Sequence, residues 1–440
     1  MTLRQGTWDT HDLVRRLCDA LDTAKRVVER LASAGYADPD ELTNNVRPEK
    51  VISETGLFLL AASATKHVDV RNRIDCVARL LTPYARSERM LLGVCLQPAL
   101  ALDYAQAHIC LTSLGHPDPR FDALLRQAVG SQAFLGRERP PHRVLEQRWF
   151  TEVWHQFDAG LSNGTRSPAV KSALNQPMDL LSSSREDIYA FTHALMYATG
   201  FNFSPRRLPR SRKTILAEAE ALLGRCLDEQ DYDLGGELLL AWPLTGNSWS
   251  AAAAFAFRVL ARVEDLAGFL PSFSTRLERL DKLLNEERTN YLLATAYHTI
   301  YVMGMLCAAA LQPGRTPPKS IPIRGAASGS AVRMLQYLDA EGQIPHWREE
   351  LNKLTEPETD AIASFLLDLA VRRQIVRRDF GTLRKLLELA YTSNLANTPT
   401  SSQAAEMLAR LATFTSTRQV REAIESPCFG KASSGKDTQA

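Results

Sequence analysis

Two histidines stand beside tyrosines in segments that are otherwise apolar. His193 lies four residues from both Tyr189 and Tyr197, so a helix over this segment places all three side chains on one face. In a second apolar segment, His298 has Tyr301 on an adjoining helical face. Because an imidazole titrates near neutrality, these groups are candidates for general acid–base catalysis. The alternative is that each histidine is a core residue hydrogen-bonded to one tyrosine.

The spacing along the chain does not show whether the two histidine segments meet. If they line one cavity, His193 and His298 together bind a metal ion or flank one substrate. Neither histidine has a second histidine four residues away, so the zinc-binding helix of that spacing is not indicated.

A third segment is rich in carboxylates. Asp231 and Asp233 precede Gly235 and Gly236, and Glu237 follows directly. Carboxylate oxygens suit divalent cations, and the glycines allow a close backbone approach, so Asp231, Asp233 and Glu237 are candidate metal ligands. A solvated acidic helix N-terminus explains the same residues, because the helix dipole favours carboxylates there.

A basic loop follows Pro205. Its arginines Arg206, Arg207 and Arg210 offer bidentate contacts to a phosphate or diphosphate. A solvated surface loop is the alternative. The chain lacks the GxxxxGK[ST] and GxGxxG motifs, so P-loop hydrolysis and Rossmann redox chemistry have no support.

Apolar residues recur at three- and four-residue steps along most of the chain, for example at Leu13, Val14, Leu17, Leu21, Ala24, Val27, Val28 and Leu31. This spacing predicts amphipathic helices. Alternating strands with hairpin signals are missing, and no repeat of fixed period recurs. The sequence therefore predicts an all-α fold, arranged as a helical toroid or an irregular antiparallel helix-pair stack with a C-terminal helical extension.

Proline- and glycine-rich stretches separate the expected helices. The stretch 313–330, rich in proline, glycine and serine, is the best linker candidate. The expected division is an N-terminal helix (1–45), a main toroid-like all-α domain (46–312), this linker, a C-terminal helical region (331–426) and a disordered tail (427–440).

The 440 residues are 45% hydrophobic and 23% charged, with a formal net charge of +2. This composition supports a packed core, and the balanced charge gives no indication of nucleic acid. The N-terminal residues lack the apolar core of a secretory signal. The apolar stretch 289–314 is long enough to cross a bilayer, but its tyrosines and His298 favour a buried core helix. We expect a soluble, cytoplasmic protein with no nucleic-acid or membrane partner.

Three stretches carry a resemblance to a known family: 101–121, which includes Pro117-Asp118-Pro119, then 187–193 and 297–304. Together they resemble an all-helical actinobacterial protein family of unassigned function, found near specialised-metabolite genes. The resemblance covers residues 50–312 and implies that the tyrosines and histidines of these helices are the positions to test. It implies no reaction. The expected architecture is also similar to α/α toroids such as terpenoid cyclases, by analogy of fold alone.

These observations favour a biosynthetic enzyme of specialised metabolism that acts on a small or peptidic intermediate by His/Tyr acid–base chemistry in a helix-lined cavity. One alternative is a non-catalytic scaffold that binds a protein partner through its C-terminal helices, where basic and apolar residues alternate: Arg372, Arg373, Arg377, Arg378 and Lys385. A further alternative is a prenyl or diphosphate enzyme, similar to a terpenoid cyclase. It depends on a divalent cation held by Asp231 and Asp233 and on the arginine loop.

Overall fold

A computed structural model of the chain describes residues 8–38, 45–155, 168–202, 207–323, 329–338 and 345–425. Within these ranges the regular elements are helices, and β-type pairing is limited to one isolated bridge between Tyr36 and Val46. The prediction of an all-α fold is therefore confirmed.

The helices up to residue 155 are α1 (Thr10–Leu31), α2 (Pro48–Ala62), α3 (Val68–Ala85), α4 (Glu88–Leu96), α5 (Ala101–Ser113), α6 (Pro119–Val129) and α7 (Pro141–His155). The middle of the chain forms α8 (Arg185–Ala198), α9 (Arg212–Asp228), α10 (Tyr232–Leu239), α11 (Ala241–Thr245), α12 (Ala251–Ala267), α13 (Leu277–Leu280) and α14 (Asn285–Ala310). The C-terminal part forms α15 (Ser330–Leu335), α16 (His346–Leu351), α17 (Glu356–Ala361), α18 (Ala363–Arg377), α19 (Phe380–Thr392) and α20 (Pro399–Glu425).

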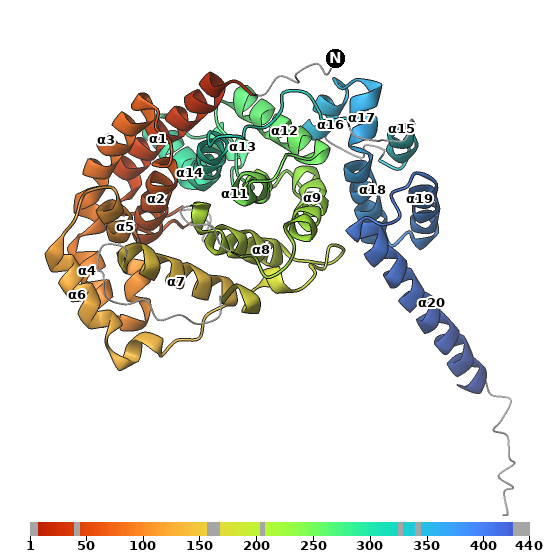
Figure 1. Cartoon of the computed structure of the whole chain (residues 1–440), viewed down its shortest axis with the longest axis horizontal. Helices are drawn as coiled ribbons and strands as arrows, with labels where there is room; N and C mark the ends of the chain where they lie inside the picture. The colour runs from red at the N-terminus through yellow and green to blue at the C-terminus, as the bar shows by residue number, and fades with distance from the viewer. Residues whose placement is uncertain are drawn as a thin grey trace, which may run out of the picture.

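The main body is a closed ring of helices (Figure 1). Helix α2 packs against α5, α5 against α7, α7 against α8, and α8 against α10. Helix α10 packs against α14, which closes the ring by packing against α2. Helix α1 lies along α14, so the expected N-terminal segment is packed into this body. The ring is the arrangement expected of a helical toroid, and it brings the first and last helices of the main body side by side.

Helix α14 is long and apolar enough to cross a membrane, yet 83% of its most apolar window is buried inside the protein. It packs against α1, α2 and α10. This burial is what a core helix of the ring requires, and it agrees with the expectation for residues 289–314.

Helix α10 approaches α14 closely at Gly236. A Cβ atom at this position would lie 2.6 Å from Cγ1 of Val302, whereas one at the neighbouring Gly235 would meet no atom nearer than 3.7 Å. Val302 is β-branched and fully buried, so it has little freedom to move aside. Because Gly236 precedes Glu237 and Val302 lies one turn after His298, this contact also sets the distance between those two side chains.

We expect Gly236→Ala to lower the free energy of unfolding by about 1–3 kcal/mol, because the added methyl group overpacks the contact with Val302. Gly235→Ala is the matched control in the same helix. It should leave stability unchanged or raise it by up to about 1 kcal/mol, since alanine has the higher helix propensity. Urea unfolding followed by circular dichroism measures both, and equal stabilities would contradict the close approach.

The C-terminal helices pack on the ring through α9 and α12 (Figure 1). Arg373 of α18 forms an ion pair with Asp228 at 2.7 Å, and Arg372 forms one with Glu229 at 2.5 Å. Both acidic residues stand at the C-terminal end of α9. Arg372 and Arg373, which the sequence suggested for binding a protein partner, are therefore engaged within the chain.

The described part of the expected linker is packed against the body. The backbone carbonyl of Pro317 accepts a hydrogen bond from the backbone N–H of Trp8 at 2.9 Å. That of Arg315 accepts one from the Trp249 indole at 2.8 Å. Residues 324–328 of this segment, and the expected tail 427–440, lie outside the described residues.

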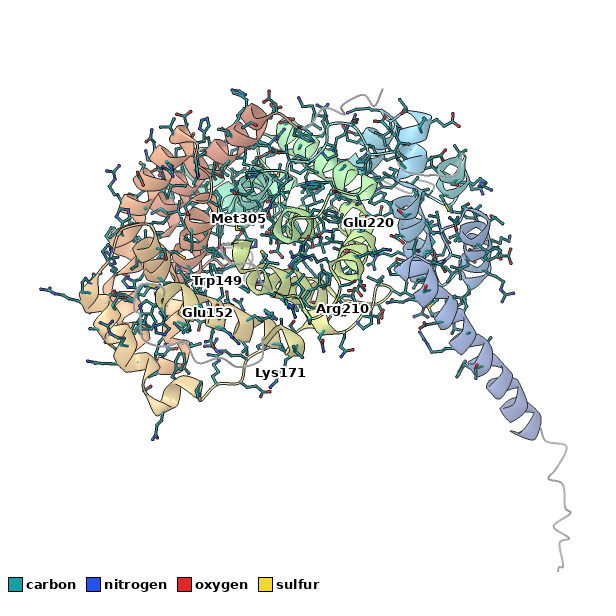
Figure 2. The ribbon with its side chains drawn as sticks, in the orientation of Figure 1. Trp149, Glu152, Lys171, Arg210, Glu220 and Met305 are labelled. Atoms are coloured by element: carbon teal, nitrogen blue, oxygen red, sulfur yellow. The ribbon has the colours of Figure 1, made fainter. Side chains whose placement is uncertain are left out.

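Two carboxyl groups lie between the ring and the C-terminal helices. Glu220 of α9, labelled in Figure 2, accepts a hydrogen bond from Ser364 of α18 at 3.3 Å. Asp368, also on α18, is 6% exposed. Burial raises the pKa of Asp368 to about 7; contact with Thr400 opposes the rise and the Glu220 carboxylate adds to it. Burial also raises the pKa of Glu220.

Asp368 keeps its proton in the folded protein up to about pH 7, but loses it near pH 3.8 when unfolded, so stability falls as pH rises through this window. We expect Asp368→Asn to flatten this dependence and to raise the free energy of unfolding at pH 8 by about 1–4 kcal/mol. The exposed Glu388→Gln on α19 is the control and should change neither quantity. Urea unfolding midpoints measured at pH 5 and pH 8 test this prediction. A loss of stability of Asp368→Asn at pH 8 would show that the raised pKa of Asp368 is wrongly assigned.

Candidate functional site

Helix α8, which carries His193, begins directly after its N-cap residue Ser184. Ser184 and Asp187 form a capping box, in which Oδ2 of Asp187 accepts a hydrogen bond from the Ser184 backbone N–H at 2.7 Å. Asp187 thus serves as a cap residue, and the helix that follows directs His193 into the ring.

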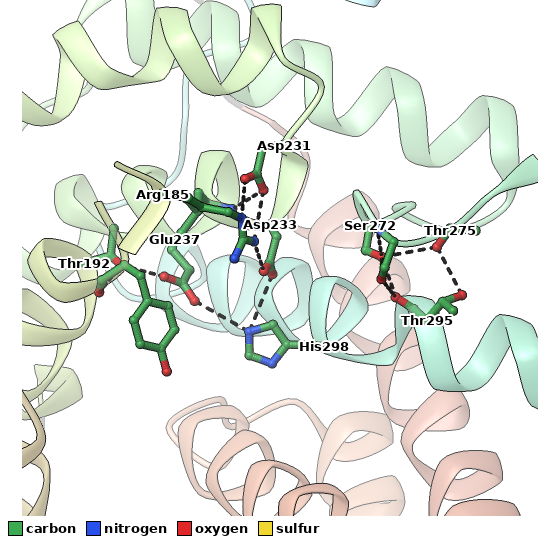
Figure 3. A network of polar contacts seen from close by, with 12 residues as sticks. Arg185, Thr192, Asp231, Asp233, Glu237, Ser272, Thr275, Thr295 and His298 are labelled. Atoms are coloured by element: carbon green, nitrogen blue, oxygen red, sulfur yellow. Dashed lines mark hydrogen bonds and ion pairs between the residues drawn. The ribbon is translucent and has the colours of Figure 1, made fainter. Parts of the chain in front are cut away.

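The two histidines meet at one carboxylate. Nε2 of His193 lies 3.5 Å from Oε1 of Glu237, and Nε2 of His298 lies 3.6 Å from the same oxygen. Figure 3 shows that His298 also faces Asp233, with Nε2 3.5 Å from Oδ1. One ligand atom from each of Asp233, Glu237 and His298 lies within 4.8 Å of the other two. The ring therefore joins the two histidine segments and the acidic segment, which the sequence left unconnected.

Further side chains hold the two carboxylates by their outer oxygens (Figure 3). The hydroxyl of Thr192 donates a hydrogen bond to Oε2 of Glu237 at 2.5 Å. Arg185 donates to Oδ2 of Asp233 at 3.1 Å and to Oδ2 of Asp231 at 2.7 Å. Oε1 of Glu237 and Oδ1 of Asp233 are left facing the imidazoles.

Charges on all sides of His298 set its protonation. Oε2 of Glu54, from α2, lies 3.2 Å from Nδ1 of His298, so both ring nitrogens face carboxylates. Burial lowers the pKa of His298, but Asp233 and Glu54 outweigh it and hold the pKa well above its usual value. Burial raises the pKa of Glu54, but His298 and Lys50 outweigh this effect and lower it to about 2. For Glu237, too, the two imidazoles outweigh burial and hold the pKa below its usual range.

Solvent reaches this cluster from one side. The side chains of His298 and Glu54 are 26% and 23% exposed, whereas those of His193 and Glu237 are 10% and 1% exposed. Neither ring nitrogen of His193 has a hydrogen-bond partner among the described residues. The cluster is thus buried around Glu237 and borders solvent at His298.

Tyr189 and Tyr197 flank His193 in different ways. The ring of Tyr189 lies over the imidazole with centroids 3.8 Å apart, and its hydroxyl accepts a hydrogen bond from Arg143 at 3.2 Å. The hydroxyl of the buried Tyr197 donates to Oε1 of Glu146 at 2.7 Å. Tyr189 is therefore the phenol placed against the imidazole face, while Tyr197 ties α8 to α7.

Tyr301 belongs to the core of the ring. Its hydroxyl is hydrogen-bonded to that of Thr55 at 2.9 Å, and its ring stacks on Phe58 with centroids 4.8 Å apart. These contacts join α14 to α2. Tyr301 is thus engaged away from the carboxylates, although it shares a helix with His298.

The three acidic residues of the expected cation site are divided between two roles. Asp231 caps the N-terminus of α10 and pairs with Arg185. Asp233 and Glu237 are four residues apart, so α10 presents both on the face turned to α14 and His298.

The arginines of the basic loop do not join this cluster where they are described. Arg210, labelled in Figure 2, forms a two-pronged ion pair with Glu218, with both N···O distances 2.6 Å. It also donates to the carbonyl of Leu174 at 2.6 Å. Arg207 is exposed, and Arg206 lies outside the described residues.

Four members of the site are not among the candidates chosen from the sequence: Glu54, Arg185, Thr192 and His142. Glu54 has a usable signal, because it is a lone carboxylate within the apolar segment VISETGLFLL. Arg185 and Thr192 have no such signal in the sequence, since their roles depend on which helix packs against α8. His142 follows Pro141; burial and then His193 lower its pKa to about 4, and its ring centroid is 6.2 Å from that of His193.

A small apolar cavity of about 60 Å³ lies one to two turns further along the same helices. Its lining includes Ala61 after Glu54 on α2, Phe201 beyond α8, Leu240 beyond α10 and Met305 on α14. In each segment the polar residue precedes the cavity residue, so the four segments run in the same direction, as the inner helices of a toroid do. A polar centre beside an apolar cavity suits a ligand with a polar group and an apolar portion.

We expect Glu54→Gln to lower the pKa of His298 in metal-free protein, because the amide removes one of the facing carboxylates. A raised histidine pKa stabilises the fold fully below pH 6.5, and this contribution is lost as pH rises through the folded value. The variant should therefore be about 1 kcal/mol or more less stable at pH 6, and the difference should shrink at higher pH. NMR titration of the histidine ring nitrogens checks the pKa, with His346 as reference; an unchanged His298 would disprove the coupling.

The fold and the cluster define an all-α ring protein with a histidine–carboxylate centre among α2, α8, α10 and α14. Residues 17–308 match the family described as Domain of unknown function (DUF6895), and the chain belongs to this family. The matched range contains the whole cluster and ends before α15. Comparison with curated proteins and with solved structures found no match.

Proposed function

We propose that this protein is an enzyme that carries out acid–base chemistry on a small or peptidic substrate at His193, Glu237 and His298. The observation that carries the proposal is the convergence of two imidazoles, from α8 and α14, on one buried carboxylate that borders solvent through His298. Buried ionisable groups with strongly shifted proton affinities cluster at catalytic sites, and imidazole is the side chain most often used to transfer protons there.

In this proposal His193 transfers the proton, because its ring nitrogens have no hydrogen-bond partner among the described residues and one of them faces Glu237. Glu237 orients the imidazole and balances its charge. Tyr189 covers one face of the ring, and the partly exposed His298 stands opposite, where a substrate enters. The apolar cavity beyond the cluster takes an apolar portion of the substrate.

The wider context is part of the same proposal. The resemblance to an actinobacterial family found near specialised-metabolite genes supports a biosynthetic role and an actinobacterial origin. The composition and the buried α14 support a soluble, cytoplasmic enzyme. The scaffold alternative is weakened because Arg372 and Arg373 are ion-paired to α9. The diphosphate alternative keeps its carboxylates, but Arg210 is paired with Glu218.

We expect His193→Gln and Glu237→Gln to abolish substrate turnover while the midpoint of thermal unfolding changes by only a few degrees. The assay incubates purified protein with a fractionated small-molecule and peptide extract and follows the compounds consumed by mass spectrometry. His346→Gln is the matched control, since this histidine also stands near a carboxylate, Glu349 at 3.7 Å, outside the cluster. Consumption that persists in both cluster variants would refute the proposal.

A further inference from the structure

We propose that Asp233, Glu237 and His298 bind one divalent transition-metal ion, with His193 beside it. The sequence suggested three carboxylates as a cation site; the structure replaces Asp231 with an imidazole. Ion binding needs no substrate, so this site and the proposed reaction can each fail alone.

The spacing of the facing atoms fits shared coordination better than hydrogen bonding. Nε2 of His298 is 3.5 Å from Oδ1 of Asp233 and 3.6 Å from Oε1 of Glu237. A charged N–H···O hydrogen bond measures about 2.7–2.9 Å. Elsewhere in this protein the buried pair His108 and Asp122 lies at 2.9 Å. Two ligands bound at about 2.0–2.1 Å to a tetrahedral ion lie about 3.3 Å apart, close to the two distances measured from His298.

The outer contacts have the pattern that orients metal ligands. Each ligand is contacted at the atom that does not face the common point: Glu237 and Asp233 accept hydrogen bonds from Thr192 and Arg185. The Glu54 carboxylate lies 3.2 Å from Nδ1 of His298 as an ion-pair partner. Metal-bound histidines usually have such a carboxylate on the second ring nitrogen, and bound carboxylates are hydrogen-bonded in turn.

A second, independent observation points to a ligand at this place. The side chain of His193 is 10% exposed, and neither of its ring nitrogens has a hydrogen-bond partner among the described residues. Its Nε2 lies 3.5 Å from Oε1 of Glu237, so it is turned toward the same centre. An imidazole left in this state is available as a further ligand or as the base beside a bound ion.

The charges of the cluster are balanced by a divalent cation. Four carboxylates, of Glu54, Asp231, Asp233 and Glu237, face two permanent cations, Arg185 and Lys50. A histidine must be neutral to bind a metal ion, and with both imidazoles neutral two negative charges are uncompensated, which one divalent ion balances. Mixed imidazole and carboxylate ligands suit Zn²⁺ and its neighbours, whereas Mg²⁺ favours oxygen ligands and water.

The test uses the full-length protein after EDTA treatment and dialysis, titrated with ZnCl₂ and with MgCl₂ in a calorimeter. We expect one Zn²⁺ per chain and much weaker binding of Mg²⁺. Co²⁺ should give a visible absorption band that Zn²⁺ displaces. Asp233→Asn and His298→Gln should each weaken Zn²⁺ binding at least about tenfold, while His346→Gln keeps the affinity of the original chain.

Circular dichroism confirms that each variant is folded, and His298→Gln is the safer of the two because its side chain is partly exposed. Absence of saturable Zn²⁺ binding to the folded original chain would overturn the proposal. So would equal affinities in the cluster variants and in His346→Gln, or binding of Mg²⁺ as tight as that of Zn²⁺. If Zn²⁺ binds as expected but His193→Gln retains turnover, the ion site stands and the proposed acid–base role falls.

Discussion

The buried carboxylate of Glu237 constrains the whole centre of this protein. A carboxylate on a side chain that is 1% exposed is costly unless opposite charge or hydrogen-bond donors surround it. Thr192 supplies a donor on one oxygen, and two imidazoles from α8 and α14 face the other. Three helices must therefore be held at fixed distances, and the close approach at Gly236 is where α10 and α14 meet this requirement.

The ring arranges the side chains of its inner helices in levels, one polar and the next apolar. Its inner segments run in the same direction, so residues at equal height along them form layers. The layer of Glu54, His193, Glu237 and His298 carries charge, and the layer one to two turns later lines an apolar cavity. The hydrogen bond between the hydroxyls of Tyr301 and Thr55 joins α14 to α2, directly after Glu54 of the charged layer.

The C-terminal helices form an addition to the ring, outside the range of the family match. Ion pairs from α18 to the end of α9 help to hold them in place. The contact also has an apolar part, in which Phe365 of α18 packs against Phe255 of α12 with ring centroids 5.4 Å apart. The site lies entirely within the ring.

The sequence by itself determined the helices, because three- and four-residue apolar periodicity and caps such as Ser184 and Asp187 are local signals. It also singled out His193, His298, Asp233 and Glu237 as candidate groups by their residue types and spacing. Only the tertiary structure decided that they meet, that Asp231 goes to Arg185 instead, and that Glu54 joins them. The physical reason is that these contacts join helices distant along the chain, and their distances follow from packing, which no local pattern encodes.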